Sequence, residues 1–484
     1  MTDITTEPST PAARTRGERA VLRLIIAMAL IEALSGVSQG YLNPILPALG
    51  GPLSITDDTI NLIWLVSSLG FAVVTPIVSR LGDSFGYRRT LRWSVAVVSI
   101  GVLLMAIVPT LVTVMIGVVL LTVVVGFIPL MMGILRATDE SRTRAGVGTM
   151  VGTLMLTVGG GGLLAGYVGQ DDPLKAFWVA VPFAAIAILC AWLLPDAGTP
   201  DKTPIAGAPL ATCSLGLIAL VTATAQGAVW GWTDLKTVAC AVGGVVLLAW
   251  WARLDSRQSR AGKHFVNLRM LAVPQIRTIT IATFFFGFAS ISYLAANGIF
   301  LHSQSADAGY GFGLDPLQIA ELFIVSSVAS FLASLATSWL MTVVSERGTL
   351  ILSGVVLAAG FVVLLIAHGS FVGYVAGLVL FGLGLGAYQS ATRALAVEGL
   401  PQDLTATAAG LNELALSLGI AIGASVVQMV IASNLTADGH IALRGFTLIW
   451  MILAAAALIA AAASTTYRRA TAATEEVAAA EGLV

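Results

Sequence analysis

SRLGDSFGYRR, residues 79–89, lies between two long apolar runs. The stretch holds two glycines, the acid Asp83 and three arginines, and it is too short to form a domain. Such a turn can join two membrane helices closely while its charged side chains remain in water. It therefore predicts a tight polar connection between two membrane-spanning helices.

The composition of the whole chain is typical of an integral membrane protein. Hydrophobic residues make up 57% of the 484 residues and charged residues only 11%, far below the charged share of soluble domains. Fifty glycines fit a helical membrane protein, because small residues let buried helices approach closely. We therefore expect an all-α integral membrane fold.

The apolar runs divide into fourteen spans of the length that crosses a bilayer as a helix, about 20 residues. Residues 1–20 and 466–484 are expected to be tails, 21–194 and 278–465 to hold six spans each, and 195–277 to be a linker with two more. The predicted spans are residues 21–46, 59–80, 93–109, 112–135, 146–169, 175–194, 209–229, 236–252, 278–300, 316–343, 349–367, 371–396, 405–433 and 441–465.

The basic residues predict the orientation of these spans. Of the 25 Lys and Arg, only Lys175, Lys236 and Arg444 fall in or beside the predicted outer loops, and the remaining 22 lie on the inner side. Cytoplasmic loops carry an excess of Lys and Arg. We therefore expect both termini in the cytoplasm.

A faint internal repeat accompanies the count of fourteen. Arg89-Thr90-Leu91 follows predicted helix 2, and Arg347-Gly348-Thr349-Leu350 follows predicted helix 10. A duplicated six-helix unit would place the two segments at matching positions. The pattern favours two six-helix bundles, helices 1–6 and 9–14, with helices 7 and 8 inserted between them.

The turn resembles the signature loop between helices 2 and 3 of the major facilitator superfamily of secondary transporters. Ser79, Asp83, Gly86 and Arg89 occupy the places of the family's small residue, acid, glycine and final base. The resemblance extends over nearly the whole chain to the fourteen-helix drug:proton antiporters. It implies two bundles around a central cavity, lined mainly by helices 1, 4, 9 and 12, and transport by alternating access. The further stretches that carry it are Asn43…Pro47, Phe177-Trp178…Pro182…Leu194-Pro195, Gly231-Trp232 and Phe265–Arg269.

Three positions depart from the pattern of those antiporters. The helix 5 signature reads Gly161-Gly162-Leu163-Leu164-Ala165-Gly166, without its usual proline. Thr122 replaces the arginine that is common on helix 4, and Ser38 replaces the acid that is common near the end of helix 1. The missing proline and arginine are compatible with a carrier of the same fold that moves a specific metabolite or lipid.

Helix 1 carries a stripe of polar residues through an otherwise apolar span. Glu32, Ser35, Gln39 and Asn43 are spaced 3, 4 and 4 apart and so share one helical face. Glu32 is near mid-membrane, where a charged acid facing lipid costs about 2.5 kcal/mol or more, so it should face the bundle interior. No Lys or Arg falls near the middle of a predicted span, so burial favours the protonated carboxyl. Glu32 is the proton-coupling candidate; the alternative is a permanently protonated carboxyl bonded to a neighbouring helix.

Other polar residues are weaker candidates for the substrate cavity. On helix 9, Ser290, Tyr293 and Asn297 could face the helix 1 stripe across a cavity, although hydrogen bonding between helices explains them equally well. The predicted substrate-cavity residues are Ser35, Gln39, Asn43, Tyr293, Asn297, Tyr388 and Gln389.

The remaining charges near helix ends have simpler interpretations. Glu321 and Glu413 either reach interfacial water or take part in coupling. Arg136 and Arg393 are interpreted as side chains that extend along the helix to the interface.

The turn itself predicts a conformational latch made of Asp83, Gly86, Arg88 and Arg89. Asp83 could pair with either arginine and oppose a helix N-terminus, whose partial positive charge attracts an acid. The resemblance implies that such contacts hold the two bundles together when the cavity opens outward. Topogenic charge alone would explain the arginines but not the spacing of the acid and the glycine.

These features predict a multi-pass transporter of the inner or plasma membrane, most simply a proton-coupled exporter of drugs or of amphipathic and cationic small molecules. One alternative is a carrier of the same fold that moves a specific metabolite or lipid, with uptake allowed as well as export. The other is a transport-inactive receptor or scaffold. We expect a monomer that contacts membrane lipid and a small-molecule substrate, with no nucleic acid, no cofactor beyond the proton gradient, no metal and no catalytic residues. The chain shows neither a Walker-type loop nor a nucleophile–base pair, and its three cysteines lack metal-ligand spacing.

Overall fold

The computed structural model describes residues 11–42, 46, 49, 52–53, 57–195, 207–259, 268–290, 294–400, 405–436 and 440–469. In this part of the chain the elements are helices, and strand pairing is limited to an isolated bridge between Leu435 and Ile441. Twelve helices of the described residues are long and apolar enough to cross a membrane. The apolar composition thus becomes an all-helical fold of membrane-spanning length.

We call helices α1 to α8 the N-terminal bundle. Predicted span 4 is divided here, because a 3₁₀ segment, η1, separates α5 from α6, and predicted span 6 begins as the 3₁₀ segment η3. The elements are α1 (Pro11–Gly40), α3 (Asp57–Phe85), α4 (Tyr87–Ile107), α5 (Leu111–Leu121), η1 (Thr122–Gly126), α6 (Phe127–Thr138), η2 (Glu140–Arg142), α7 (Thr143–Val168), η3 (Pro173–Ala180) and α8 (Val181–Leu193).

We call helices α11 to α18 the C-terminal bundle. Predicted span 9 corresponds to two helices, α11 and α12. The elements are η4 (Leu268–Ala272), α11 (Pro274–Ser290), α12 (Leu294–His302), α13 (Ser305–Ala308), α14 (Pro316–Val344), α15 (Glu346–Ala367), α16 (Phe371–Val397), α17 (Thr405–Ser433) and α18 (Leu443–Ser464).

The two bundles meet along two seams. α7 packs against α14 at one seam, and α3 packs against α17 at the other. On the first seam the helices approach closely, since the Ser334 hydroxyl donates a hydrogen bond to the Gly148 carbonyl at 2.8 Å. A side chain at Gly148 would bring its Cβ to 2.7 Å from the Ser334 carbonyl oxygen. The second predicted span of each bundle thus packs against the fifth span of the other.

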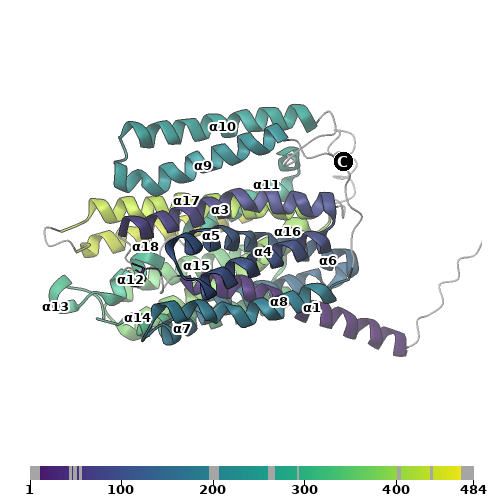
Figure 1. Cartoon of the computed structure of the whole chain (residues 1–484), viewed down its shortest axis with the longest axis horizontal. Helices are drawn as coiled ribbons and strands as arrows, with labels where there is room; N and C mark the ends of the chain where they lie inside the picture. The colour runs from purple at the N-terminus through teal and green to yellow at the C-terminus, as the bar shows by residue number, and fades with distance from the viewer. Residues whose placement is uncertain are drawn as a thin grey trace, which may run out of the picture.

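The inserted pair, α9 (Gly207–Trp230) and α10 (Leu235–Ser259), lies on the outside of the bundles. Figure 1 shows α10 outermost, with α9 between it and the rest of the molecule. α9 packs on both α3 and α17, so the hairpin covers the second seam. The outward side chains of α10 include Val242, Val245 and Trp250, which are exposed as expected for a lipid-facing helix.

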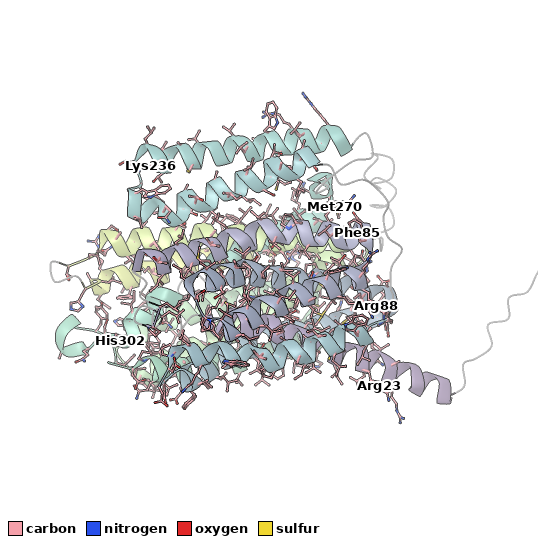
Figure 2. The ribbon with its side chains drawn as sticks, in the orientation of Figure 1. Arg23, Phe85, Arg88, Lys236, Met270 and His302 are labelled. Carbon is pink, nitrogen blue, oxygen red and sulfur yellow. The ribbon has the colours of Figure 1, made fainter. Side chains whose placement is uncertain are left out.

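The first turn of α1 and the last turn of α18 lie at the same end of the molecule (Figure 1). Arg23 and Arg88 are at this end in Figure 2, whereas Lys236 and His302 are at the other. We call it the arginine-rich end, defined by Arg88, Arg136, Arg144, Arg347 and Arg469.

The apolar core is continuous between the bundles at the arginine-rich end. One core cluster fills the N-terminal bundle and continues into Met341, Leu350 and Leu395 of the C-terminal bundle. A second cluster, around Phe300 and Trp450, fills the rest of the C-terminal bundle. The bundles are therefore joined by buried apolar contacts at the end where the arginines gather.

The internal repeat is visible in the backbone of two helix starts. Gly86 caps the N-terminus of α4 at φ 92° and ψ 138°, and Ser345 caps α15 at φ 85° and ψ 162°. Leu91 and Leu350, five residues after each cap, are both fully buried. Positive φ is rarely adopted by residues with a Cβ atom, so the turn needs glycine in the first copy and holds Ser345 under strain in the second.

Substituting Gly86 is expected to destabilise the fold. Gly86→Ala should lower the free energy of unfolding by about 1–3 kcal/mol, because alanine at this φ and ψ is strained. The matched control is Gly160→Ala on α7, where a Cβ would meet no atom within 4 Å and alanine favours the helix. Thermal unfolding in detergent would compare the two. Equal midpoints for both variants would show that the turn tolerates a side chain.

Candidate functional site

Glu32 lies in the interior on α1, with only 1% of its surface exposed. Its carboxyl shares a side-chain hydrogen bond with Ser35, one turn later on the same helix. The second carboxyl oxygen, Oε2, is buried and has no hydrogen-bond partner among the described residues. The carboxyl is therefore held on one side and free on the other.

Two buried charges lie within electrostatic range of Glu32, Arg393 on α16 and Glu413 on α17. Arg393 Nε is 2.6 Å from Glu413 Oε1, and a second guanidinium nitrogen donates to Glu413 Oε2 at 3.0 Å. Arg393 is 5% exposed and Glu413 8%. The expectation that Glu32 has no nearby counter-charge is wrong, and so is the interpretation of Arg393 as reaching the interface. Side chains that extend to water keep the head group exposed, whereas this guanidinium is enclosed between helices.

Amide side chains extend the polar cluster on both bundles. Gln39 donates to the Ser35 carbonyl at 3.3 Å and to the Ser35 hydroxyl at 3.1 Å, so Ser35 connects Glu32 with Gln39. On α16, Gln389 accepts a hydrogen bond from Arg393. We call Glu32, Ser35, Arg393, Glu413 and Gln389 the buried charge cluster. It combines residues from both bundles, as a site between them requires.

The other predicted cavity residues do not join this cluster. Tyr388 donates or accepts at Ser464 of α18 at 3.0 Å, bonds the Ala460 carbonyl, and stacks on Phe286. Its hydroxyl thus bonds within the C-terminal bundle, and its role in a substrate cavity stays a prediction. Asn297 is 1% exposed, and its amide atoms have no partner among the described residues. Asn43 and Tyr293 lie outside the described residues.

The position of the missing helix 4 arginine is filled by packing. Thr122 is fully buried at the start of η1, and its hydroxyl donates to the Val119 carbonyl at 2.7 Å. It touches Gly70 of α3 so closely that a Cβ on that glycine would overlap the threonine. A long charged side chain at this position would have to displace α3.

Ion pairs between the bundles cluster at the arginine-rich end. Arg144 at the start of α7 pairs with Glu346 at the start of α15 and with Glu398 after α16, the latter at 2.6 Å. Arg469 pairs with the same two acids, at 3.4 and 2.9 Å. The Tyr467 hydroxyl donates to Glu346 at 3.1 Å. Burial, followed by the nearby acids, raises the pKa of Tyr467, so the phenol remains a donor.

Arg136 makes a second connection between the bundles. Its guanidinium donates to the Leu400 carbonyl and to the Thr405 hydroxyl at 2.9 Å, both in the C-terminal bundle, and pairs with Glu140 at 3.0 Å. With 3% of its surface exposed, Arg136 is buried at the bundle interface. The prediction that it extends to the membrane interface is therefore wrong.

The signature turn packs near the first turns of α17. Ser79 on α3 lies against Gly410, where a Cβ would come within 2.9 Å of the serine side chain. Asp83 is buried and accepts a hydrogen bond from the Tyr87 hydroxyl at 3.2 Å. Arg88 donates to the Trp192 carbonyl of α8 at 3.3 Å, and Arg89 is exposed. Arg88 thus ties the turn to α8, and Ser79 lies on the seam with α17.

Sequence reasoning missed Arg144, Glu346 and Glu398 as contacts between the bundles. Their signal is weak, because each sits at a helix end where a charge needs no special explanation. The echo of the signature turn at Arg347 was the available pointer, since Glu346 immediately precedes it. Arg144 lies 202 positions from Glu346 and 254 from Glu398 in sequence, and only the fold brings it to the two acids.

Two helical bundles that meet along two seams around a buried charge cluster define a membrane transport protein. The chain belongs to the Major Facilitator Superfamily, whose model matches residues 28–424 and 278–483. It is thus a multi-pass protein of the cell membrane, in a family of transporters rather than enzymes.

The related proteins have low sequence identity to this chain. An uncharacterised MFS-type transporter of Mycobacterium tuberculosis is 25% identical over 320 residues, which are 64% of this chain and 46% of that protein. This alignment spans less than half of that relative. A probable actinorhodin transporter of Streptomyces coelicolor is 25% identical over 427 residues, covering 84% of this chain and 71% of that protein. The tetracenomycin C resistance and export protein of Streptomyces glaucescens is 22% identical over 457 residues, covering 88% and 79%.

Solved structures share the fold. The human organic anion transporter superposes with a TM-score of 0.66 at 15% identity, covering 92% of this chain and 99% of that one. Likeness at this identity concerns the arrangement of helices and not the substrate.

Proposed function

We propose that the protein exports drugs or other amphipathic and cationic small molecules in exchange for protons, by alternating access. The observation that carries this proposal is the buried carboxyl of Glu32 inside a membrane-spanning helix, which has one oxygen without a hydrogen-bond partner among the described residues. An ionisable group within a membrane span is costly, and such groups mark proton relays and substrate paths. Two relatives named for antibiotic transport or export support the choice of substrate class.

In the proposed cycle Glu32 alternates between its proton and the substrate. Its deprotonated form attracts a cation from the cytoplasm, and protonation from outside releases that cation. The buried charge cluster then holds two acids and one base, so its net charge favours a cationic substrate when Glu32 is ionised. The contacts at the arginine-rich end would keep the cytoplasmic side closed during release.

The proposal includes the topology and the latch. We infer fourteen spans by adding α3 and the α11–α12 pair to the twelve candidates, with both termini in the cytoplasm as the basic residues favour. The domain bounds remain 21–194 and 278–465, with the linker and α9–α10 in 195–277. Asp83, Gly86, Arg88 and Arg89 would form the latch, and the pairs of Arg144 with Glu346 and Glu398 would act beside it. We propose a monomer in contact with lipid that uses the proton gradient and no other cofactor.

Flux in reconstituted vesicles tests this function. Inverted membrane vesicles acidified inside should accumulate the cationic dye ethidium, and dissipating the pH gradient with nigericin should stop the accumulation. Vesicles without the protein are the control. Accumulation that does not depend on the pH gradient would indicate a facilitator. If neither ethidium nor any of a panel of antibiotics accumulates, the result would favour a receptor or scaffold.

A further inference from the structure

A cavity of about 540 Å³ lies where the turn between α14 and α15 meets the segment after α18. It is lined by the last turn of α14, residues 341–344, and by Ser345, Glu346, Arg347 and Tyr467. Its volume is within the range of about 300–1,000 Å³ that is typical of small-molecule sites. Ser345 and Arg347 are exposed, so the cavity opens to the molecular surface. Ser345 also has a φ of 85°, and strained residues of this kind cluster at ligand sites.

The charges beside the cavity leave one arginine without an acid. Glu346 and Glu398 each pair with Arg144 of α7 and with Arg469 after α18. These two acids are thus matched by two arginines. The Arg347 guanidinium makes neither a hydrogen bond nor an ion pair with the described residues. Its positive charge and its N–H donors are therefore available to a ligand in the cavity.

The internal repeat shows what an arginine at this position binds when an acceptor is present. Arg88 and Arg347 are each the second residue after the positive-φ cap of their helix. Arg88 donates to the Trp192 carbonyl near the end of α8, the helix that packs against α4. In the second copy α15 packs against α18, but the carbonyls of residues 462–464 at the end of α18 already accept from the N–H groups of the next turn, at 3.0–3.1 Å. Arg347 therefore lacks the oxygen acceptor of its counterpart and lines a cavity instead.

The surface next to the cavity is apolar on the side of α14. Trp339 and Val343 are one helical turn apart on α14, with 64% and 62% of their surfaces exposed. Tryptophan is enriched where a membrane helix meets the lipid head groups. Because Val343 lines the cavity together with Arg347, a ligand there meets a hydrocarbon surface and a cation at once. A phospholipid with a negatively charged head group has the two complementary parts.

We propose that this cavity binds an anionic phospholipid of the cytoplasmic leaflet, with Arg347 on the phosphate and with Trp339 and Val343 beside the acyl chains. A guanidinium recognises phosphate through two parallel N–H donors. Arginines next to a membrane helix attract the anionic lipids of the cytoplasmic leaflet. This inference rests on the proposed topology, in which the arginine-rich end faces the cytoplasm.

Native mass spectrometry of the purified full-length protein tests the site without measuring transport. The protein in detergent is titrated with phosphatidylglycerol, or with phosphatidylcholine as the lipid of zero net charge. The wild type should bind phosphatidylglycerol more tightly than phosphatidylcholine. Arg347→Gln should weaken the binding of phosphatidylglycerol about five- to tenfold, the effect of one arginine on an anionic head group. Arg347→Lys keeps the charge and should retain most of the affinity.

Arg257→Gln is the matched control for a general loss of positive charge. Arg257 is also exposed and without a partner among the described residues, but it lies on α10, which packs against α9 and η4 rather than against α14 or α15. Its substitution should leave the affinity for phosphatidylglycerol unchanged. Equal losses in Arg257→Gln and Arg347→Gln would show general attraction to a basic surface and would overturn the site, as would equal affinities of the wild type for the two lipids.

Two further arms separate a lipid from a soluble phosphate and locate the site. Glycerol 3-phosphate should not displace phosphatidylglycerol, because it lacks the acyl chains; displacement would assign the cavity to a soluble phosphate and reject the lipid. A photoactivatable phosphatidylglycerol should cross-link to residues 339–347, as mapped by peptide mass spectrometry. Cross-links confined to other segments would contradict the proposal.

The lipid site and the proposed function can fail separately. Phosphatidylglycerol binding that depends on Arg347, together with absent ethidium accumulation, would remove the exporter function and keep the site. Gradient-driven accumulation, together with binding that is the same in Arg347→Gln and the wild type, would remove only the lipid site.

Discussion

Glu32→Gln is expected to abolish export driven by the pH gradient while leaving the protein folded. Glutamine keeps the size of the side chain and can still bond Ser35, but it cannot bind or release a proton. Gradient-driven ethidium accumulation should fall to the level of vesicles without the protein. Because the buried charge cluster then loses one of its two acids, binding of cationic substrates should also weaken.

The matched control is Glu321→Gln. Glu321 is an acid on α14 that accepts a hydrogen bond from Tyr167 at 2.5 Å, on the exposed side of the seam between α7 and α14. An amide oxygen can accept the same bond, so accumulation should be retained. Gradient-driven accumulation that persists in Glu32→Gln at the wild-type rate would remove Glu32 from the mechanism. The fold would be unaffected by that result.

Arg144→Gln is expected to shift the resting conformation toward opening at the arginine-rich end. The substitution removes the pairs with Glu346 and Glu398, which connect the two bundles and are only partly exposed. Hydrogen bonds to charged groups contribute about 1.5–3 kcal/mol each when partly buried. Because about 1.4 kcal/mol corresponds to a tenfold change in an equilibrium constant, the open population should rise by at least about tenfold.

Distances between spin labels would measure this shift. Labels at Thr138 and Thr465 report on opposite bundles, and both positions are exposed at the arginine-rich end. The longer-distance population should increase in Arg144→Gln. Arg142→Gln is the control, because Arg142 pairs with Asp139 within the same connection at 3.7 Å. Equal distance distributions for the two variants would show that the pairs of Arg144 do not hold this end closed.

The buried ion pairs illustrate why part of the site was hidden in the sequence. Arg393 is four residues from the end of α16, a place where an arginine commonly extends to water. Its burial follows from the way α16 packs against α17, which encloses the guanidinium with Glu413. Helical spacing assigns a residue to a face of its own helix but does not say which helix covers that face.

For Glu32, in contrast to Arg393, the sequence predicted the position of the side chain. Its position on α1 and its polar neighbours Ser35 and Gln39 follow from spacing alone, because one helical face repeats every three or four residues. The cost of a charge in lipid then places that face inward. In the structure Glu32 is buried, and Ser35 and Gln39 are joined by a hydrogen bond on that face. The sequence did not predict which charges influence Glu32, because Arg393 and Glu413 both belong to the other bundle.

The sequence by itself determined the features set by local chemistry. Apolar length determined the membrane helices, and the spacing of glycine and acid in residues 79–89 determined the turn that joins α3 to α4. Tertiary structure alone decided which charges meet. Arg144 reaches Glu398 across 254 residues, and Arg393 turns to Glu413 rather than to Glu32. The physical reason is that electrostatic partners depend on distances of a few ångströms between side chains, and those distances are set by how helices from the two bundles cross.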